Sequence, residues 1–254
     1  MDSILPINSL SLKAAPPTFY FISLHMLRLT LALVLATFTA IARAQDAATA
    51  LAGKVEGKTY VSPTGVFKVT IPVLPELGGE ISDTPNVVTF QDAFNVHISI
   101  AAFSQDATQR WENSTRGTKD YLIYFFSNFV LSDFKQAFQG VQIESAKFIP
   151  GTLEGSLITY ILIPAGSMFA NKVAQLDNSD RIAIAKRGNL LFVKNGHIFV
   201  ISVELAERVI EGRTYTKTTA EEDEILRQRL NDVVDKIQFA KLPGATPAAA
   251  TPNK

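Results

Sequence analysis

Alternation of apolar and polar residues predicts the first strands of this chain. In the run 66–71, apolar residues alternate with Lys68 and Thr70, so a half-buried strand is expected that ends before a proline. Two further β-rich runs, 86–91 and 95–103, are joined by an Asp-Ala-Phe-Asn sequence of hairpin length. These two strands are expected to pair antiparallel.

Two more hairpins are predicted later in the chain. The strand-like runs 141–149 and 152–163 are joined by a Pro-Gly turn dipeptide. The runs 189–194 and 197–205 flank the Asn-Gly pair 195–196, which suits a type I′ turn because both central positions of that turn need positive φ.

Helical spacing of apolar residues predicts a long helix over 118–138 and a second helix at the end of the domain. Gly140 is expected to stop the first helix. Thr219 and Glu222 form a capping box at the start of the second. The first helix has a heavily aromatic face (Phe125, Phe126, Phe129, Phe134, Phe138), and the second buries Leu226, Leu230, Val233 and Ile237.

The order of these elements predicts an α+β fold, with an antiparallel β-sheet flanked by helices. Parallel pairing would need a helical crossover between successive strands. Most connections here are turns of a few residues instead, which favours an antiparallel sheet.

The beginning of the chain has the pattern of an export signal. Arg28 precedes an apolar run that is too short to span a membrane, and an Ala-x-Ala cleavage site follows at 42–44. Residues 1–44 are therefore expected to be a signal peptide cleaved after Ala44, with translation starting at Met26. The compact signal is typical of bacteria, so we expect a periplasmic or extracellular protein without stable membrane insertion after cleavage.

Two segments of biased composition flank the predicted domain. The alanine-rich segment 45–57 is expected to be a linker, and 243–254, rich in proline, alanine and threonine, a disordered tail. A single α+β domain is expected over 58–242.

Composition narrows the classes of function. The 24 lysines and arginines equal the 24 aspartates and glutamates, with no basic block, which argues against nucleic acid as a partner. The chain has no cysteine, so disulfides, thiolate nucleophiles and cysteine metal sites are excluded. No cofactor motif is found, and Gly78 and Gly79 lack the lysine and serine of a nucleotide-binding loop.

The predicted order of elements resembles the PsbP-like fold, an α/β/α sandwich shared by many exported proteins. The resemblance rests on segments 60–72, 90–100 and 194–203 and on the terminal helix. It implies a domain that binds or stabilises another macromolecule. No family site can be transferred residue by residue.

Two histidines of the mature chain, His97 and His197, are the polar candidates for a metal site. If their strands were neighbours, they could approach each other, with Asp92 or Glu204 nearby, and bind zinc or copper. No ligand motif supports this, so we expect exposed strand residues and no metal site.

No serine or carboxylate has the sequence context of a catalytic residue. Ser156 and Ser167 follow glycines but are not on a strand-to-helix nucleophile turn. The aspartates that lie in predicted loops are explained as turn residues, although they leave an acid pair open (Asp83, Asp92, Asp106, Asp177, Asp180).

The segment 165–180 is too long for a hairpin turn, and loops of such length are often functional. Met168, Phe169, Asn171 and Lys172 are the predicted contacts with a partner or ligand, since exposed Met and Phe supply contact area. Alternatively, the apolar side chains fold back as a short helix that caps the sheet.

Three hypotheses of function follow. The first is an exported, non-catalytic binding or accessory module for an unknown protein. The second is a carrier of a small apolar ligand, held between the first helix and the sheet by the phenylalanines. The third is a hydrolase with an unrecognised site.

Overall fold

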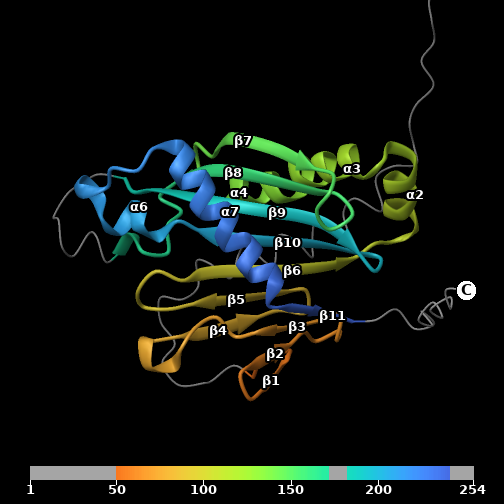
Figure 1. Cartoon of the computed structure of the whole chain (residues 1–254), viewed down its shortest axis with the longest axis horizontal. Coiled ribbons are helices and arrows are strands. Elements are labelled where there is room, and N and C mark those ends of the chain that lie inside the picture. The colour runs from red at the N-terminus through yellow and green to blue at the C-terminus, as the bar shows by residue number, and fades with distance from the viewer. Residues whose placement is uncertain (1–49, 172–181, 241–254) are drawn as a thin grey trace, which may run out of the picture.

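The computed structural model describes residues 50–171 and 182–240. The predicted signal peptide, the C-terminal tail and Lys172 lie outside these residues. The described chain forms a seven-stranded antiparallel sheet, in the order β4-β5-β6-β10-β9-β8-β7, and a four-stranded sheet, in the order β1-β2-β3-β11 (Figure 1). The strands of the large sheet are β4 (Glu80–Asp83), β5 (Val87–Gln91), β6 (His97–Ser104), β7 (Gln142–Ile149), β8 (Ser156–Pro164), β9 (Ile184–Lys194) and β10 (His197–Glu204).

All three predicted hairpins are present, as the pairs β5–β6, β7–β8 and β9–β10. Asn195 and Gly196 have φ of 51° and 72°, as the type I′ turn requires. The turn between β7 and β8 is longer than predicted. It passes through positive φ at Leu153, Glu154 and Gly155, so β8 starts only at Ser156.

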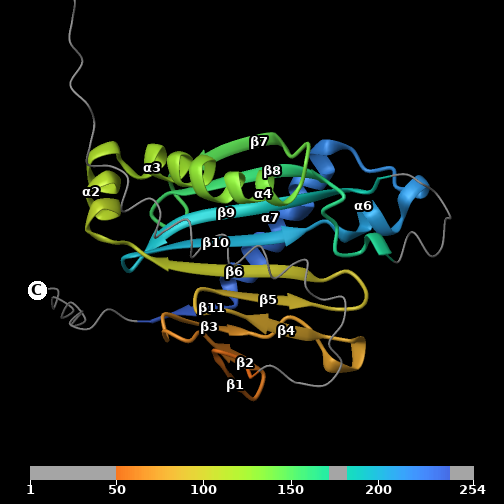
Figure 2. The same cartoon turned by 180° about the vertical axis from the view of Figure 1, so that it is seen from behind.

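A layer of helices covers one face of the large sheet over β8 and β9 (Figure 2). It consists of α2 (Ala107–Arg116), α3 (Thr118–Phe125), the π-helical turn η2 (Phe126–Val130) and α4 (Leu131–Ala137). The last three form the single helix predicted over 118–138. Helix α2 was not predicted because it buries no residue, and Ala107 and Trp111 are its only apolar residues, too few to show a helical spacing in the sequence.

The opposite face is covered by α7 (Thr219–Asp235) and the small sheet. The capping box of α7 is formed by Thr218 and Glu221, one residue before the predicted pair. Ile237 is not helical but lies in strand β11 (Ile237–Phe239). Helix α7 packs closely on β9 because Gly188 has no side chain, and an added Cβ would lie 3.1 Å from Leu226 Cβ.

The small sheet begins inside the segment that was predicted to be a linker. Its other strands are β1 (Lys54–Glu56), β2 (Thr59–Val61) and β3 (Phe67–Thr70). Asp83 of the large sheet accepts hydrogen bonds from the backbone N–H groups of Ala52 and Gly53. These bonds join residues 52 and 53 to the large sheet, so the structured part of the chain includes residues before 58.

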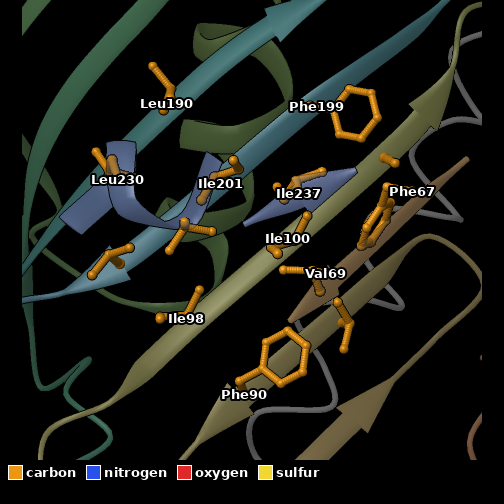
Figure 3. Packing of buried hydrophobic residues seen from close by; sticks show 14 of the residues in the cluster. Phe67, Val69, Phe90, Ile98, Ile100, Leu190, Phe199, Ile201, Leu230 and Ile237 are labelled. Carbon is orange, nitrogen blue, oxygen red and sulfur yellow. The ribbon is translucent and has the colours of Figure 1, made fainter. Parts of the chain in front are cut away.

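The two faces of the large sheet carry separate apolar clusters. One lies towards the small sheet and α7 and includes Phe67, Phe90, Phe199 and Leu230 (Figure 3). The other lies under the helices and contains four of the predicted phenylalanines, with Phe138 partly buried at its edge (Phe125, Phe126, Phe129, Phe134). The α+β class and the helix-flanked antiparallel sheet are confirmed.

Short elements complete one end of the molecule: η1 (Pro75–Leu77), α6 (Ala206–Ile210) and η3 (Gly212–Thr214). Within the described part of the chain, no helix is both long and apolar enough to cross a membrane.

The turn at Gly196 provides a test of the hairpin assignment. Gly196→Ala should lower the free energy of unfolding by about 1 kcal/mol, because the residue needs a left-handed backbone conformation. Gly151→Ala is the matched control, since no atom lies within 4 Å of an added Cβ at either position and Gly151 has no positive φ. Equal effects in urea denaturation would contradict the type I′ assignment.

Candidate functional site

The carboxylate of Glu204, at the end of β10, is fully buried and binds groups from three other segments. Its oxygens lie 2.9 Å from His97 Nδ1, 2.6 Å from Ser167 Oγ and 3.4 Å from an Arg187 guanidinium nitrogen. The backbone N–H of Met168 donates to it at 3.4 Å. We call Glu204, His97, Arg187 and Ser167 the Glu204 cluster.

The register of three neighbouring strands creates this cluster. Arg187 of β9 lies directly opposite Glu204 of β10. Ile98 pairs with Val203 on the other side, which places His97 of β6 beside Glu204. All three side chains lie on the helix-covered face, where the guanidinium of Arg187 is 5.7 Å from the centre of the Phe134 ring.

Burial and neighbouring charges determine which groups of the cluster carry a proton at neutral pH. Burial alone would raise the pKa of Glu204, but the hydrogen bond from His97 and the charge of Arg187 hold the pKa below its ordinary value. Burial and the Arg187 charge lower the pKa of His97, against the effect of Glu204. An ionised carboxylate only accepts hydrogen bonds, so the neutral His97 carries its proton on Nδ1 and donates it to Glu204.

A second row of polar side chains crosses the sheet next to the cluster. It runs over five neighbouring strands in direct register: Thr89, Ser99, Ser202, Asn189 and Thr159. Asn189 donates to Thr159 Oγ1 at 3.4 Å. The buried Asn189 Oδ1 and Ser202 Oγ have no hydrogen-bond partner among the described residues. The helix-covered face therefore changes from apolar under α3 to polar towards α6.

Residues 166–168 of the predicted contact segment are anchored on the cluster. Ser167 and Met168 bind Glu204, and Arg187 donates to the carbonyl of Gly166 at 3.1 Å. Phe169 is 2% exposed and packs with residues of α6, so it belongs to the core of this corner. Met168 is partly buried and Asn171 is exposed.

Other apolar side chains are exposed at this corner. Ile182 is 64% exposed, Ile184 41% and Ile210 37%. The exposure of these residues was not predicted, because an isolated isoleucine next to a loop does not differ from a core residue in its sequence pattern.

The two histidines are far apart along their strands. His97 pairs with Gln91, whereas His197 is opposite Ser104 at the other end of β6. The expectation that His97 is an exposed strand residue was wrong, because it faces the helix-covered side and is 2% exposed. Glu204 does lie beside it, as the alternative required. Among the described residues, no group of three His, Cys, Asp or Glu side chains could hold a metal ion.

The other polar candidates have local roles. Asp92 accepts hydrogen bonds from the backbone N–H groups of Phe94, Asn95 and Val96 and so closes the β5–β6 turn. Asp106 caps α2. Ser156 is completely buried at the start of β8. Asp177 and Asp180 lie outside the described residues.

A second ionic cluster, on the opposite face of β9, was not predicted. Lys186 is fully buried and its Nζ lies 3.0 Å from Glu222, 2.6 Å from Asp223 and close to Glu144. Arg208 also pairs with Glu222, at 2.6 Å. Burial lowers the pKa of Lys186, but the three carboxylates outweigh this and raise it. These contacts fasten α7 and α6 to the sheet.

Removing the charge of Glu204 should destabilise the fold. In Glu204→Gln the side chain keeps its shape, but the buried guanidinium of Arg187 loses its ion pair with Glu204, so the free energy of unfolding should fall by about 3 kcal/mol. The control is Ser202→Ala on the same strand and face, which should change stability by less than about 1 kcal/mol because the hydroxyl oxygen makes no hydrogen bond to a described residue. Similar losses in both variants would contradict the central role of the carboxylate.

Lowering the pH should reduce the stability that the buried, neutral His97 contributes. Because its pKa is lowered from 6.5, the unfolded chain binds the proton more readily than the folded one. The stability contributed by neutral His97 is complete above pH 6.5 and is lost as the pH falls through the lowered pKa. Asp133 has the opposite effect on stability. Burial raises its pKa to about 6, so the folded chain binds this proton more readily and the contribution of Asp133 grows as the pH falls. Denaturation of wild type and His97→Gln at several pH values separates the two, and equal pH dependence in both proteins would contradict the assignment.

Comparison with known proteins gives similarities of fold. No protein-family model and no curated protein matches the chain. Among solved structures, it is similar to a cyanobacterial PsbP (CyanoP) of Synechocystis, with 12% identity, a TM-score of 0.43, and coverage of 78% of this chain and 98% of the other. It is also similar to the Ran-binding protein Mog1p of Saccharomyces cerevisiae, with 10% identity, a TM-score of 0.43, and coverage of 75% and 96%. A protein with the PsbP-like fold that the sequence resembles is thus among these similar structures. At identities of 10% and 12%, the similarity is one of fold alone.

Proposed function

We propose that this protein is an exported, non-catalytic binding module that recognises a protein partner with Met168, Ile182 and Ile184, at the corner where the segment Gly166–Phe169 is anchored. The observation that carries the proposal is the fully buried Glu204 carboxylate, which binds Ser167 and the Met168 backbone. Export is supported by the signal-like pattern that precedes the domain.

The energetics of burial support a positioning role for the cluster. Taking charged groups out of water costs several kcal/mol per ion, and apolar replacements of similar volume are often as stable. A buried carboxylate shared by a loop and three strands is therefore better explained by the precise position that it imposes on the loop. Next to this loop stand exposed isoleucines, a type of side chain that supplies contact area at an interface.

The order of groups in the cluster supports binding rather than nucleophilic catalysis. A catalytic serine donates its proton to an imidazole, and the acid binds the far side of that imidazole. Here Glu204 lies between Ser167 and His97 and accepts a hydrogen bond from each. The hydroxyl of Ser167 thus has a carboxylate partner, and His97 is turned to the same carboxylate.

Site-specific photo-crosslinking in the producing cells tests the proposal. A photoreactive residue at Ile182 should give one defined crosslinked product, whereas the same residue at Ile123, exposed on α3, should not. Ser167→Ala removes the 2.6 Å bond to Glu204 and should reduce the Ile182 product several-fold, while Ser202→Ala should leave it unchanged. Equal products at Ile182 and Ile123, or no effect of Ser167→Ala, would argue against the proposal.

A further inference from the structure

Most of the large apolar side chains that are exposed in the described part of the chain lie at one end of the molecule. We call this set the end face; its members are Leu74, Leu77, Phe94, Ile182, Ile184 and Ile210. It includes the corner described above and continues past α6 onto η1 and the β5–β6 turn. In Figures 1 and 2 these elements lie at the same end of the sheet, opposite to α2.

Hydrogen bonds join the parts of the end face to one another. The N–H of Ala93, in the β5–β6 turn, donates to the carbonyl of Leu77 at 3.1 Å. Asn95 of the same turn donates to Glu207 of α6 at 3.4 Å. Helix α6 packs on Phe169 through Ala206 and Val209. The elements that carry the end face are therefore joined to one another, although its residues come from four separate parts of the sequence.

The half of the end face that lies outside the corner is formed by η1 and the β5–β6 turn. It exposes three large apolar side chains. Leu74 is 54% exposed, Leu77 41% and Phe94 56%. The 3-10 helix η1 buries none of its residues. Single exposed apolar residues are common on protein surfaces, but a contiguous group of large ones marks an interaction site.

The charged residues around η1 and the β5–β6 turn indicate the chemistry of the partner. The segments 74–80 and 92–95 contain Glu76, Glu80 and Asp92 and no lysine or arginine. Acidic groups around an apolar patch are complementary to a partner that carries basic groups around its own apolar centre. They are unfavourable next to a membrane surface with anionic lipids, which attracts basic segments instead.

We infer that the end face binds a protein segment with apolar residues at its centre and lysine or arginine at its edge. This inference rests on the proposed function, because it extends the same recognition surface from the corner at Ile182 to η1 and the β5–β6 turn. Leu77 and Phe94 would contact the apolar centre of the partner, and Glu76 and Glu80 its basic edge.

A random peptide library, selected on the full chain as processed by the producing cell, provides the probe. The selected peptides should be enriched in large apolar residues together with lysine or arginine. Combined Leu77→Ser and Phe94→Ser should weaken their binding by about tenfold or more, the loss typical of central interface residues. Ile123→Ser is the matched control, since Ile123 is 41% exposed like Leu77, and it should bind the peptides as the wild type does.

The charged rim and the corner are tested with the same peptides. Combined Glu76→Lys and Glu80→Lys should weaken binding several-fold at low salt and less at high salt. If Ile182→Ser abolishes binding but Leu77→Ser with Phe94→Ser does not, the corner binds alone and the inference fails while the proposed function stands. If neither variant differs from wild type, both fail.

Two further outcomes would overturn the inference. Selection of acidic peptides would contradict the charge complementarity. Binding of the wild type to vesicles of anionic phospholipid, lost in the Leu77→Ser and Phe94→Ser variant, would show that the occupant is a lipid surface. Circular dichroism of each variant verifies that these substitutions of exposed residues leave the fold intact.

Discussion

The structure at one end of this molecule depends on the burial of the Glu204 carboxylate. A buried ion of this kind needs a counter-charge and further hydrogen bonds to offset a desolvation cost of several kcal/mol. Arg187 supplies the charge, and His97, Ser167 and the Met168 backbone supply hydrogen bonds. These groups meet only if β6, β10 and β9 keep their register, since a shift by one residue would turn each side chain to the other face.

Strand β9 buries two cations on opposite faces of the sheet. Lys186 points towards α7 and is neutralised by Glu222, and Arg187 points towards α4 and is neutralised by Glu204. Both carboxylates come from the part of the chain that follows β9. The two ionic clusters therefore tie the last third of the domain to the centre of the sheet. The phenylalanines of α3, η2 and α4 pack these helices on the sheet.

The same arrangement bears on the partner site that we propose. The aromatic side chains of the first predicted helix are used for core packing with Leu191 and Leu157 of the sheet. Exposed apolar residues gather instead at the end where the Glu204 cluster anchors a loop and where η1 and the β5–β6 turn meet α6. The buried Glu204 cluster thus anchors the loop next to some of these exposed apolar residues.

The sequence by itself determined the α+β class, the three hairpins and the terminal helix, because these depend on local periodicity and turn chemistry. The Asn195 and Gly196 turn is the clearest case, since its backbone conformation depends on two neighbouring residues. Only the tertiary structure decided which polar residues meet. Glu204, Arg187 and His97 look like ordinary polar positions within strands, and their contact arises from pairing between strands up to 107 residues apart in sequence. The exposure of Leu77 and Ile182 was likewise decided by tertiary packing, because an apolar residue is the same in the sequence whether or not another segment covers it.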